Sequence, residues 1–309
     1  MTSEPQTTNP LAPTAAFAGC CAIWGSTFLV ISIGNDTVAP LWAATLRLAL
    51  ASVLLVALNR LTGHRLPRGP ALVTAAWFGF LNLGLSFCCL YWGEKSLPSG
   101  LAAVLYGTVP LTTALLARAA GLERLRALKV AGALVALLGV GVIFSDQLRT
   151  RVAVLPLLAL FAAPTLGSMA GVVLKRGPHE HPLATNAVGS MVGLVVCGLA
   201  SFIAREPHAF PTDPRAIGPI LYLAVAGSVV AYGLYTWLVN HWDLSRISFI
   251  AVVAPVVAVF LGALVRHERL TAAEISGALL VIVGLTLGIM SDRRPAAAAA
   301  PALAGAREA

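Results

Sequence analysis

Long apolar stretches and short polar breaks alternate along nearly the whole chain. Ten stretches come close to or exceed the roughly 20 apolar residues that a helix needs to cross the hydrocarbon core of a bilayer. Glycine, proline and charged residues separate the stretches, for example at 61–70, 175–182 and 205–214. The predicted helices span residues 15–34, 40–59, 71–92, 97–118, 128–145, 153–174, 183–204, 216–239, 247–265 and 272–290. The pattern therefore predicts an all-α membrane protein with ten transmembrane helices.

The second half of the chain repeats landmarks of the first half, about 145 positions later. The matched series are Pro110, Glu123-Arg124-Leu125, Gly132 and Gly139, and then Pro255, Glu268-Arg269-Leu270, Gly277 and Gly284. A unit of five helices has an odd number of spans, so the two copies are predicted to form inverted repeats. The predicted divisions are a disordered N-terminus at 1–14, a first repeat at 15–146, a second repeat at 152–290 and a disordered Ala/Pro-rich tail at 291–309.

The composition agrees with a membrane protein and excludes a soluble one. Hydrophobic residues make up 58% of the 309 residues and charged residues only 11%, whereas about a quarter of a soluble domain is charged. The net charge of +8 comes mostly from basic residues between the apolar stretches. The positive-inside rule explains these residues better than binding to nucleic acid does. Counting lysines and arginines in alternate loops predicts that both termini are cytoplasmic.

The sequence lacks the motifs of catalytic, nucleotide and metal sites. It contains no His-Glu-x-x-His, no Gly-x-Ser-x-Gly and no Walker lysine loop. His179-Glu180-His181 lies in a proline-flanked loop and has the wrong spacing for a pair of metal ligands on a helix. The five cysteines lie in apolar stretches without Cys-x-x-Cys spacing, which is typical of small buried hydrophobic residues. We therefore predict neither an enzyme nor a cofactor or metal site.

Arg47 is a strong base inside a predicted helix. A charge at the centre of a bilayer costs about 2.5–3.5 kcal/mol on insertion scales, so its side chain should face the bundle interior or a polar partner. Arg47 could attract the carboxylate of a substrate, form a structural pair, or extend to the membrane interface.

Two prolines, Pro110 and Pro255, lie well inside the fourth and ninth predicted helices. Each removes a backbone donor, and the resulting kink is either a cavity wall or a packing feature. Other polar and aromatic residues at membrane depth are candidates for substrate contact: Trp24, Ser26, Thr27, Asn82, Ser86, Tyr91, Trp92, Tyr106, Thr108, Asn186, Tyr232, Tyr235, Asn240 and Ser248. From these sets we single out Trp24, Arg47, Asn82, Tyr106, Pro110, Tyr235 and Pro255 as predicted substrate-binding residues.

Acidic residues near helix ends have simpler explanations. Glu94 ends the third predicted helix beside Lys95, where it is either a proton-coupling acid or, as we favour, an interfacial residue. Thr271 and Glu274 have the spacing of a capping box at the start of the tenth helix. Glu123 precedes the fifth helix, where its charge would complement the helix dipole.

Several motifs together resemble a known family. They are Ala22-Ile23-Trp24-Gly25-Ser26-Thr27-Phe28, Pro40 with Leu46-Arg47-Leu48, Tyr91-Trp92-Gly93-Glu94, Pro98-Ser99-Gly100-Leu101-Ala102-Ala103, and the duplicated landmarks given above. Over residues 15–290 the chain resembles the EamA-like ten-helix members of the drug/metabolite transporter superfamily. The resemblance implies two inverted EamA repeats around a central cavity. The chain departs from a symmetric pattern where Gly189 corresponds to Arg47 and Leu166 to Trp24.

The function implied by the resemblance is secondary transport, often export, of amino acids or related small metabolites across the inner membrane of a bacterium. Alternating access of two inverted repeats would carry the substrate. Its partners would then be a small-molecule substrate and the lipid bilayer. An intramembrane enzyme acting on a lipid-linked substrate and a non-transporting receptor or scaffold are the alternatives. Small-x-x-x-small pairs such as Gly284 and Gly288 allow close helix packing but leave the oligomeric state open.

Overall fold

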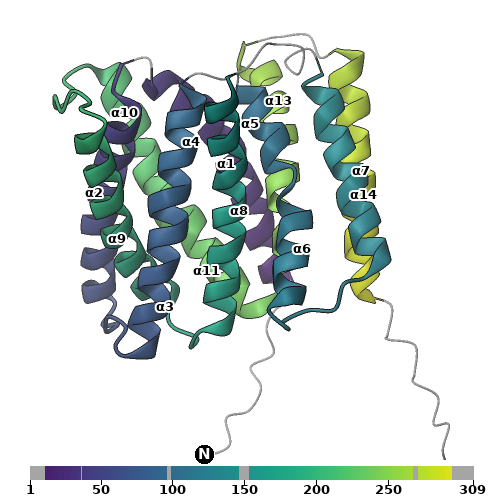
Figure 1. The fold of residues 1–309 in the computed structure, drawn as a ribbon, viewed down its shortest axis with the longest axis horizontal. Helices are drawn as coiled ribbons and strands as arrows, with labels where there is room; N and C mark the ends of the chain where they lie inside the picture. Colours follow the sequence, from purple (N-terminus) through teal and green to yellow (C-terminus); the bar gives the residue numbers. More distant parts are fainter. Residues whose placement is uncertain (1–10, 36, 96–98, 146–152, 267–270, 294–309) are drawn as a thin grey trace, which may run out of the picture.

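The computed structural model describes residues 11–35, 37–95, 99–145, 153–266 and 271–293, which form a bundle of helices (Figure 1). The first repeat contains α1 (Leu11–Asn35), α2 (Pro40–Leu61), α3 (Pro70–Phe78), the π-helix η1 (Gly79–Ser86), α4 (Phe87–Glu94), α5 (Ser99–Tyr106), α6 (Val109–Ala119) and α7 (Ala127–Ile143). The second contains α8 (Val154–Arg176), α9 (Pro182–Ile203), α10 (Pro214–Tyr222), the π-helix η3 (Leu223–Val230), α11 (Ala231–His241), α12 (Leu244–Ile247), α13 (Ile250–Arg266) and α14 (Ala272–Arg293).

These segments combine into ten spans. Nine spans in the described part of the chain are long and apolar enough to cross a membrane, and α7 is a shorter apolar helix of 17 residues. The prediction of an all-α protein with ten membrane helices in two repeats is confirmed. Helix α1 begins at Leu11, so residues 11–14 are helical, with Pro13 in the first turn where proline is tolerated. Residues 291–293, predicted as the start of the disordered tail, are also helical, because α14 ends at Arg293. The remaining parts of the predicted disordered termini, 1–10 and 294–309, lie outside the described residues.

Four predicted helices are composite, and the irregularities occur in matching spans of the two repeats. The third span of each repeat contains a π-helical segment, η1 or η3. The fourth span of each is interrupted, after Tyr106 in the first repeat and after Ile247 in the second. A run of apolar residues predicts the length of a span but not its backbone hydrogen-bonding pattern, so the sequence did not distinguish these segments from regular helices.

Proline and capping residues define several helix starts. The first turns of α2, α3, α9 and α10 each contain a proline: Pro40, Pro70, Pro182 and Pro214. Proline lacks a backbone N–H, but the N–H groups of a first turn have no hydrogen-bond acceptor within the helix, so no bond is lost there. The capping box at α14 is confirmed. The Thr271 amide donates to Glu274 Oε2 at 2.7 Å, and the Glu274 amide donates to Thr271 Oγ1 at 3.2 Å.

Matching helices of the two repeats pack against each other at the two ends of the bundle. Helices α2 and α9 form one end, and α7 and α14 form the other (Figure 1). The second contact uses the repeated glycines: a Cβ on Gly132 would lie 2.6 Å from the Gly284 carbonyl oxygen, and a Cβ on Gly139 would lie 2.6 Å from that of Gly277. Only glycine permits this approach, so the duplicated motif packs against its own copy.

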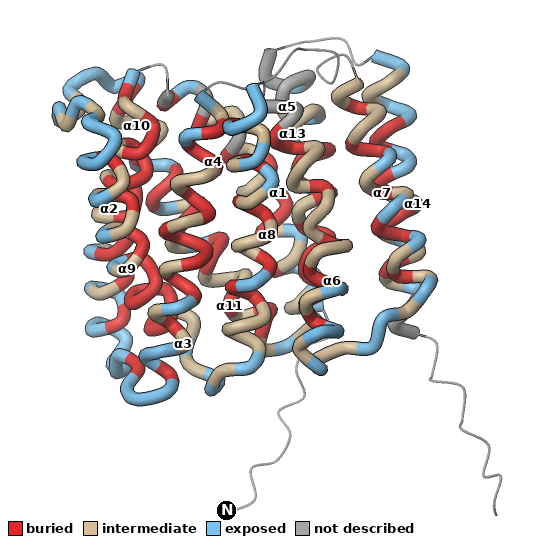
Figure 2. The backbone as a smooth tube through the Cα atoms, viewed as in Figure 1, coloured by how far each residue is buried: buried red, intermediate tan, exposed pale blue. Residues whose placement is uncertain are grey.

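Burial is concentrated on the sides of the helices that face the bundle interior (Figure 2). Large apolar side chains cover the outside, including Val53 at 67% exposed, Leu138 at 66% and Phe202 at 63%. Such residues would be unfavourable on a surface in water but suit contact with lipid tails. The structure therefore has the inside and outside expected of a protein that crosses the bilayer.

A buried ionic network links the two repeats where α6, α7 and α12 meet. Glu123 Oε1 accepts a hydrogen bond from the Ser245 amide at 3.2 Å, and Glu123 Oε2 contacts the Ser245 hydroxyl. Lys129 Nζ donates to Ser245 Oγ at 2.6 Å and lies 3.8 Å from Glu123 Oε2. Glu123 precedes α7 as expected, and tertiary packing also directs its carboxylate to the first turn of α12, a contact that the sequence did not indicate.

Candidate functional site

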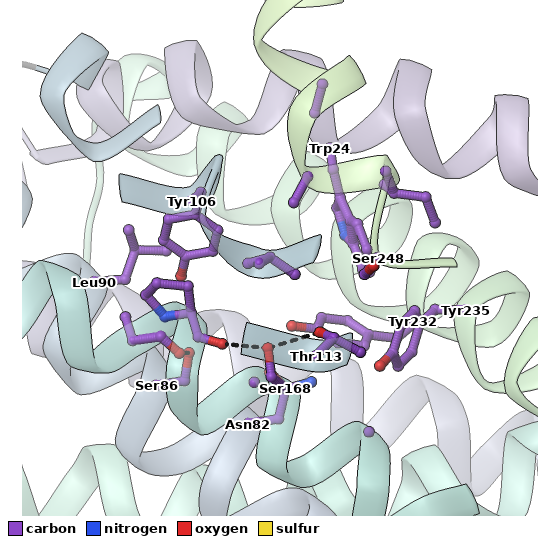
Figure 3. A pocket seen from close by; sticks show the side chains of 18 of the residues that line it. Trp24, Asn82, Ser86, Leu90, Tyr106, Thr113, Ser168, Tyr232, Tyr235 and Ser248 are labelled. Carbon is purple, nitrogen blue, oxygen red and sulfur yellow. Dashed lines mark hydrogen bonds between the residues drawn. The ribbon is translucent and has the colours of Figure 1, made fainter. Parts of the chain in front are cut away.

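A cavity of about 150 Å³ lies between helices of the two repeats (Figure 3). This volume is below the roughly 300–1,000 Å³ typical of pockets for drug-sized ligands, so the cavity suits a small metabolite. Apolar residues form much of its wall. Its polar and aromatic lining residues are Trp24, Thr27, Arg47, Asn82, Ser86, Phe87, Tyr106, Thr113, Ser168, Tyr232, Tyr235 and Ser248.

Arg47 brings a positive charge to the wall of this cavity. Its side chain, on α2, is only 3% exposed. Its Nε donates to Ser228 Oγ at 2.9 Å, and its Nη1 donates to the Tyr91 hydroxyl at 3.2 Å. Its Cζ also lies 4.6 Å from the centre of the Phe87 ring, within the range of a cation–π contact. These partners in the described structure are neutral, so the guanidinium charge is available to an anionic group in the cavity.

The surroundings of Arg47 explain why the two repeats differ at this position. A Cβ on Gly227, in η3, would lie 2.8 Å from Arg47 Nη2, so glycine there leaves room for the guanidinium. Gly189, the counterpart of Arg47, instead packs directly against the backbone of η1. A Cβ on Gly79 of η1 would lie 2.4 Å from the Gly189 carbonyl oxygen. The first repeat therefore contributes a charge where the second contributes a close backbone contact.

Three aromatic side chains form one wall of the cavity. Trp24, on α1, lies 5.1 Å from the ring centre of Tyr232 and 5.6 Å from that of Tyr235, both on α11. The two tyrosine rings are 6.2 Å apart and nearly perpendicular. Figure 3 shows the three side chains grouped together, with Tyr106 and Ser86 at a distance from them. This wall offers apolar ring surface to a ligand together with polar groups at the ring edges.

Hydroxyl groups from both repeats meet at another part of the cavity. Thr113 Oγ1, on α6, donates to Ser168 Oγ, on α8, at 2.9 Å (Figure 3). Ser168 Oγ in turn donates to the Pro164 carbonyl oxygen at 3.0 Å, and Ser86 Oγ donates to the Ala163 carbonyl oxygen at 2.8 Å. The sequence analysis did not select Thr113, Pro164 or Ser168. Since Leu166 corresponds to Trp24, Ser168 corresponds to Ser26, and this correspondence was the one sequence signal for this part of α8.

The two repeated prolines lie behind the cavity wall rather than in it. Pro110 and Pro255 are buried but are absent from the residues that line the cavity. The expectation that Pro110 kinks a continuous helix is wrong: α5 ends at Tyr106, and Pro110 lies in the first turn of α6. Pro255 is inside α13, as expected.

The prolines nevertheless affect the lining through the backbone. In a regular helix the amide at position 110 would donate to the carbonyl of Tyr106, and the amide at 255 to that of Ala251. Proline cannot make either bond. Tyr106 and Ala251 both line the cavity and are themselves related by the repeat. The duplicated prolines therefore alter backbone hydrogen bonding at matching points of the wall.

The other predicted site residues divide into two groups. Trp24, Arg47, Asn82, Tyr106 and Tyr235 all line the cavity. Among the wider set of polar residues, several have structural contacts outside it: Ser26 is hydrogen-bonded to the Tyr222 hydroxyl, and Asn186 donates to the Tyr232 carbonyl and to Thr236. Hydropathy identified both groups as polar residues at membrane depth but could not separate them.

The described residues contain no group of three or more histidine, cysteine or acidic residues that could hold a metal ion. A polytopic bundle of two related repeats, with a polar-lined cavity between them, defines the class of membrane transporters. The chain belongs to the EamA-like transporter family, whose model matches residues 14–145 and 154–290. It is thus a multi-pass membrane transporter and not an enzyme.

Curated relatives and a solved structure agree with this membership. An uncharacterized inner membrane transporter of Escherichia coli K12, YedA, is 32% identical over 274 residues, which cover 86% of this chain and 88% of YedA. A probable amino-acid metabolite efflux pump of the same organism is 28% identical over 289 residues, covering 88% and 92%. A solved crystal structure has a TM-score of 0.78 and 20% identity, covering 93% of this chain and 99% of that one, which shows that the fold is shared.

Proposed function

We propose that the chain is a secondary transporter of the bacterial inner membrane that exports a small amphipathic metabolite, such as an amino acid, by alternating access. Both termini are cytoplasmic in this proposal. The observation that supports it most directly is that Arg47 and the aromatic wall line the same small cavity. Arg47 binds the carboxylate, and Trp24, Tyr232 and Tyr235 pack against the apolar part. Similarity to a probable amino-acid metabolite efflux pump supports the same substrate class.

The buried position of Arg47 allows a quantitative test of the carboxylate. A hydrogen bond to a charged group contributes about 1.5–3 kcal/mol, so removing the substrate carboxylate should weaken binding by about 10- to 150-fold. We therefore expect L-leucine and L-phenylalanine to compete for the site far better than their amides. Arg47→Gln should remove most of this preference, because it removes the charge that distinguishes acid from amide.

Counterflow in proteoliposomes provides the assay. Purified protein is reconstituted into liposomes, and each batch of liposomes is loaded with one unlabelled amino acid from a panel. Uptake of the labelled form of that amino acid is then measured without any ion gradient. Trp24→Ala and Tyr106→Ala should abolish counterflow while the protein remains folded by size-exclusion chromatography. Trp77→Ala is the matched control, since Trp77 is 51% exposed on the outside of α3 and should transport normally. Normal flux from both cavity variants would refute the assignment of the site.

A further inference from the structure

Glu94, the last residue of α4, has a buried carboxyl oxygen without a partner. The residue as a whole is partly buried, but its Oε1 is inaccessible to solvent and has no hydrogen-bond partner in the structure. The expectation that Glu94 is an interfacial residue accounts for its place at the end of a span but not for this oxygen. At this oxygen an ionised carboxylate would have neither water nor a donor, whereas a protonated carboxyl would not carry an unsatisfied charge there.

Glu94 also continues the row of side chains that faces the cavity. Ser86 and Leu90 line the cavity, and Glu94 follows at the same four-residue spacing, one turn beyond Leu90. Tyr91 lies three residues before Glu94 on the same helix, α4, a spacing that places two side chains on neighbouring parts of a helix surface. Tyr91 in turn accepts the hydrogen bond from Arg47. The carboxyl therefore belongs to a residue one turn beyond the cavity lining, on the same helix as the tyrosine that holds Arg47.

The elements packed around α4 bring no described charged group into contact with this carboxyl. Helix α2 contributes Arg47, whose side chain reaches Tyr91; α5 contributes the neutral Tyr106; η1 contributes Ser86; and α9 contributes the thiol of Cys197, which contacts Cys88. Helix α8 approaches through Leu160 and the Pro156 carbonyl oxygen, beside Gly93. On its own element, Tyr91 is neutral and Lys95 is exposed. Among the described groups, protonation rather than an ion pair is thus the available way to neutralise Glu94.

We propose that Glu94 is the proton-carrying group of this transporter and couples export of the substrate to inward movement of one proton, a role that rests on the function proposed above. When the cavity is open to the periplasm, the carboxylate takes a proton from hydronium and leaves water. In the closed state the neutral acid is stable without a partner. When the cavity opens to the cytoplasm, water accepts the proton, and the carboxylate is regenerated as the substrate binds at Arg47.

The test uses the full-length protein in proteoliposomes, with the membrane potential clamped by potassium and valinomycin and with labelled L-leucine and L-phenylalanine as probes. One proton exchanged per molecule converts a gradient of one pH unit into an accumulation of about tenfold. The wild-type protein should accumulate the probes to this extent on the acidic side of the membrane, because the probes move in the direction opposite to the protons. Glu94→Gln should exchange the probes in counterflow, yet show no accumulation in response to the pH gradient. Glu94→Asp should recover it, because it restores a titratable group.

Glu180→Gln is the matched control, since it removes a carboxylate from the loop between α8 and α9, away from the cavity. Infrared difference spectra between acidic and alkaline pH provide a readout that needs no substrate. The other carboxyl groups of the chain also contribute to these spectra, so the wild-type spectrum should contain one titrating carboxylic acid band that the Glu94→Gln spectrum lacks. Wild-type counterflow without any response to the pH gradient would overturn proton coupling alone. Failure of counterflow with every amino acid tested would overturn the transport function and this role with it. An unchanged pH response in Glu94→Gln would remove the role from this residue.

Discussion

The contact between α7 and α14 leads to a prediction about stability. Gly139 and Gly277 approach each other so closely that a Cβ on either would lie 2.6 Å from the carbonyl oxygen of the other. Gly139→Ala should therefore force the two helices apart. Gly141→Ala is the matched control, because it lies on the same helix and a Cβ there meets nothing within 4 Å.

The magnitude follows from the geometry. Ordinary contact to a Cβ begins at 3.4 Å, so relieving a separation of 2.6 Å requires a shift of about 0.8 Å. A gap of that size loses about a quarter to a half of the dispersion energy of the neighbouring contacts, and overpacking typically costs about 1–3 kcal/mol. Both alanines gain a similar increment of helix propensity, so the difference between the two variants isolates the cost of separating the helices.

Reversible unfolding by SDS in mixed micelles is the assay. We expect Gly139→Ala to be about 1–3 kcal/mol less stable than Gly141→Ala. The double variant Gly139→Ala/Gly277→Ala should cost less than the sum of its single variants, because one displacement of the helices relieves both clashes. Equal stability of Gly139→Ala and Gly141→Ala would refute the reasoning, as would strict additivity of the double variant.

Two further predictions concern the buried network and a loop. Lys129→Met leaves Glu123 without the nearby cation and should destabilise the protein by up to about 3–5 kcal/mol, with Lys129→Met/Glu123→Gln more stable than the single variant in the same SDS titration. Burial and then the stacked ring of His64, 3.6 Å away between ring centres, lower the pKa of His181 below its ordinary 6.5. The unfolded chain then binds this proton more readily, so stability should fall as the pH drops below 6.5. His64→Ala should reduce this fall in melting temperature, and an unchanged pH profile would contradict the coupling.

Prediction from sequence succeeded where a property belonged to a residue or to a short window. Arg47 was expected to face the bundle interior because a lipid-facing charge is costly, and it does so. The capping box of Thr271 and Glu274 was recognised because its contacts span only three residues. The contact of Glu123 with Ser245 was not foreseen for the opposite reason: Ser245 is in the other repeat, 122 positions along the chain.

The cavity shows the same division. Trp24 and Tyr106 were selected as polar or aromatic residues at membrane depth, and so were Ser26 and Asn186, which bond to neighbouring helices. Thr113 and Ser168 were overlooked because a small hydroxyl in an apolar run can bond to its own helix and gives little signal. Which of these groups reaches the cavity depends on the rotation of each helix against its neighbours.

The sequence by itself determined the spans, the duplication and the membership of a transporter family. These properties follow from the transfer of each apolar residue out of water and from the order of residues along the chain, and both are local. The tertiary structure alone decided how Arg47 is held, that Gly139 meets Gly277, and that Glu94 keeps an unpartnered oxygen. A membrane helix is apolar on nearly every side, so its pattern does not show which face turns inward. Only packing of the two repeats against each other makes that choice.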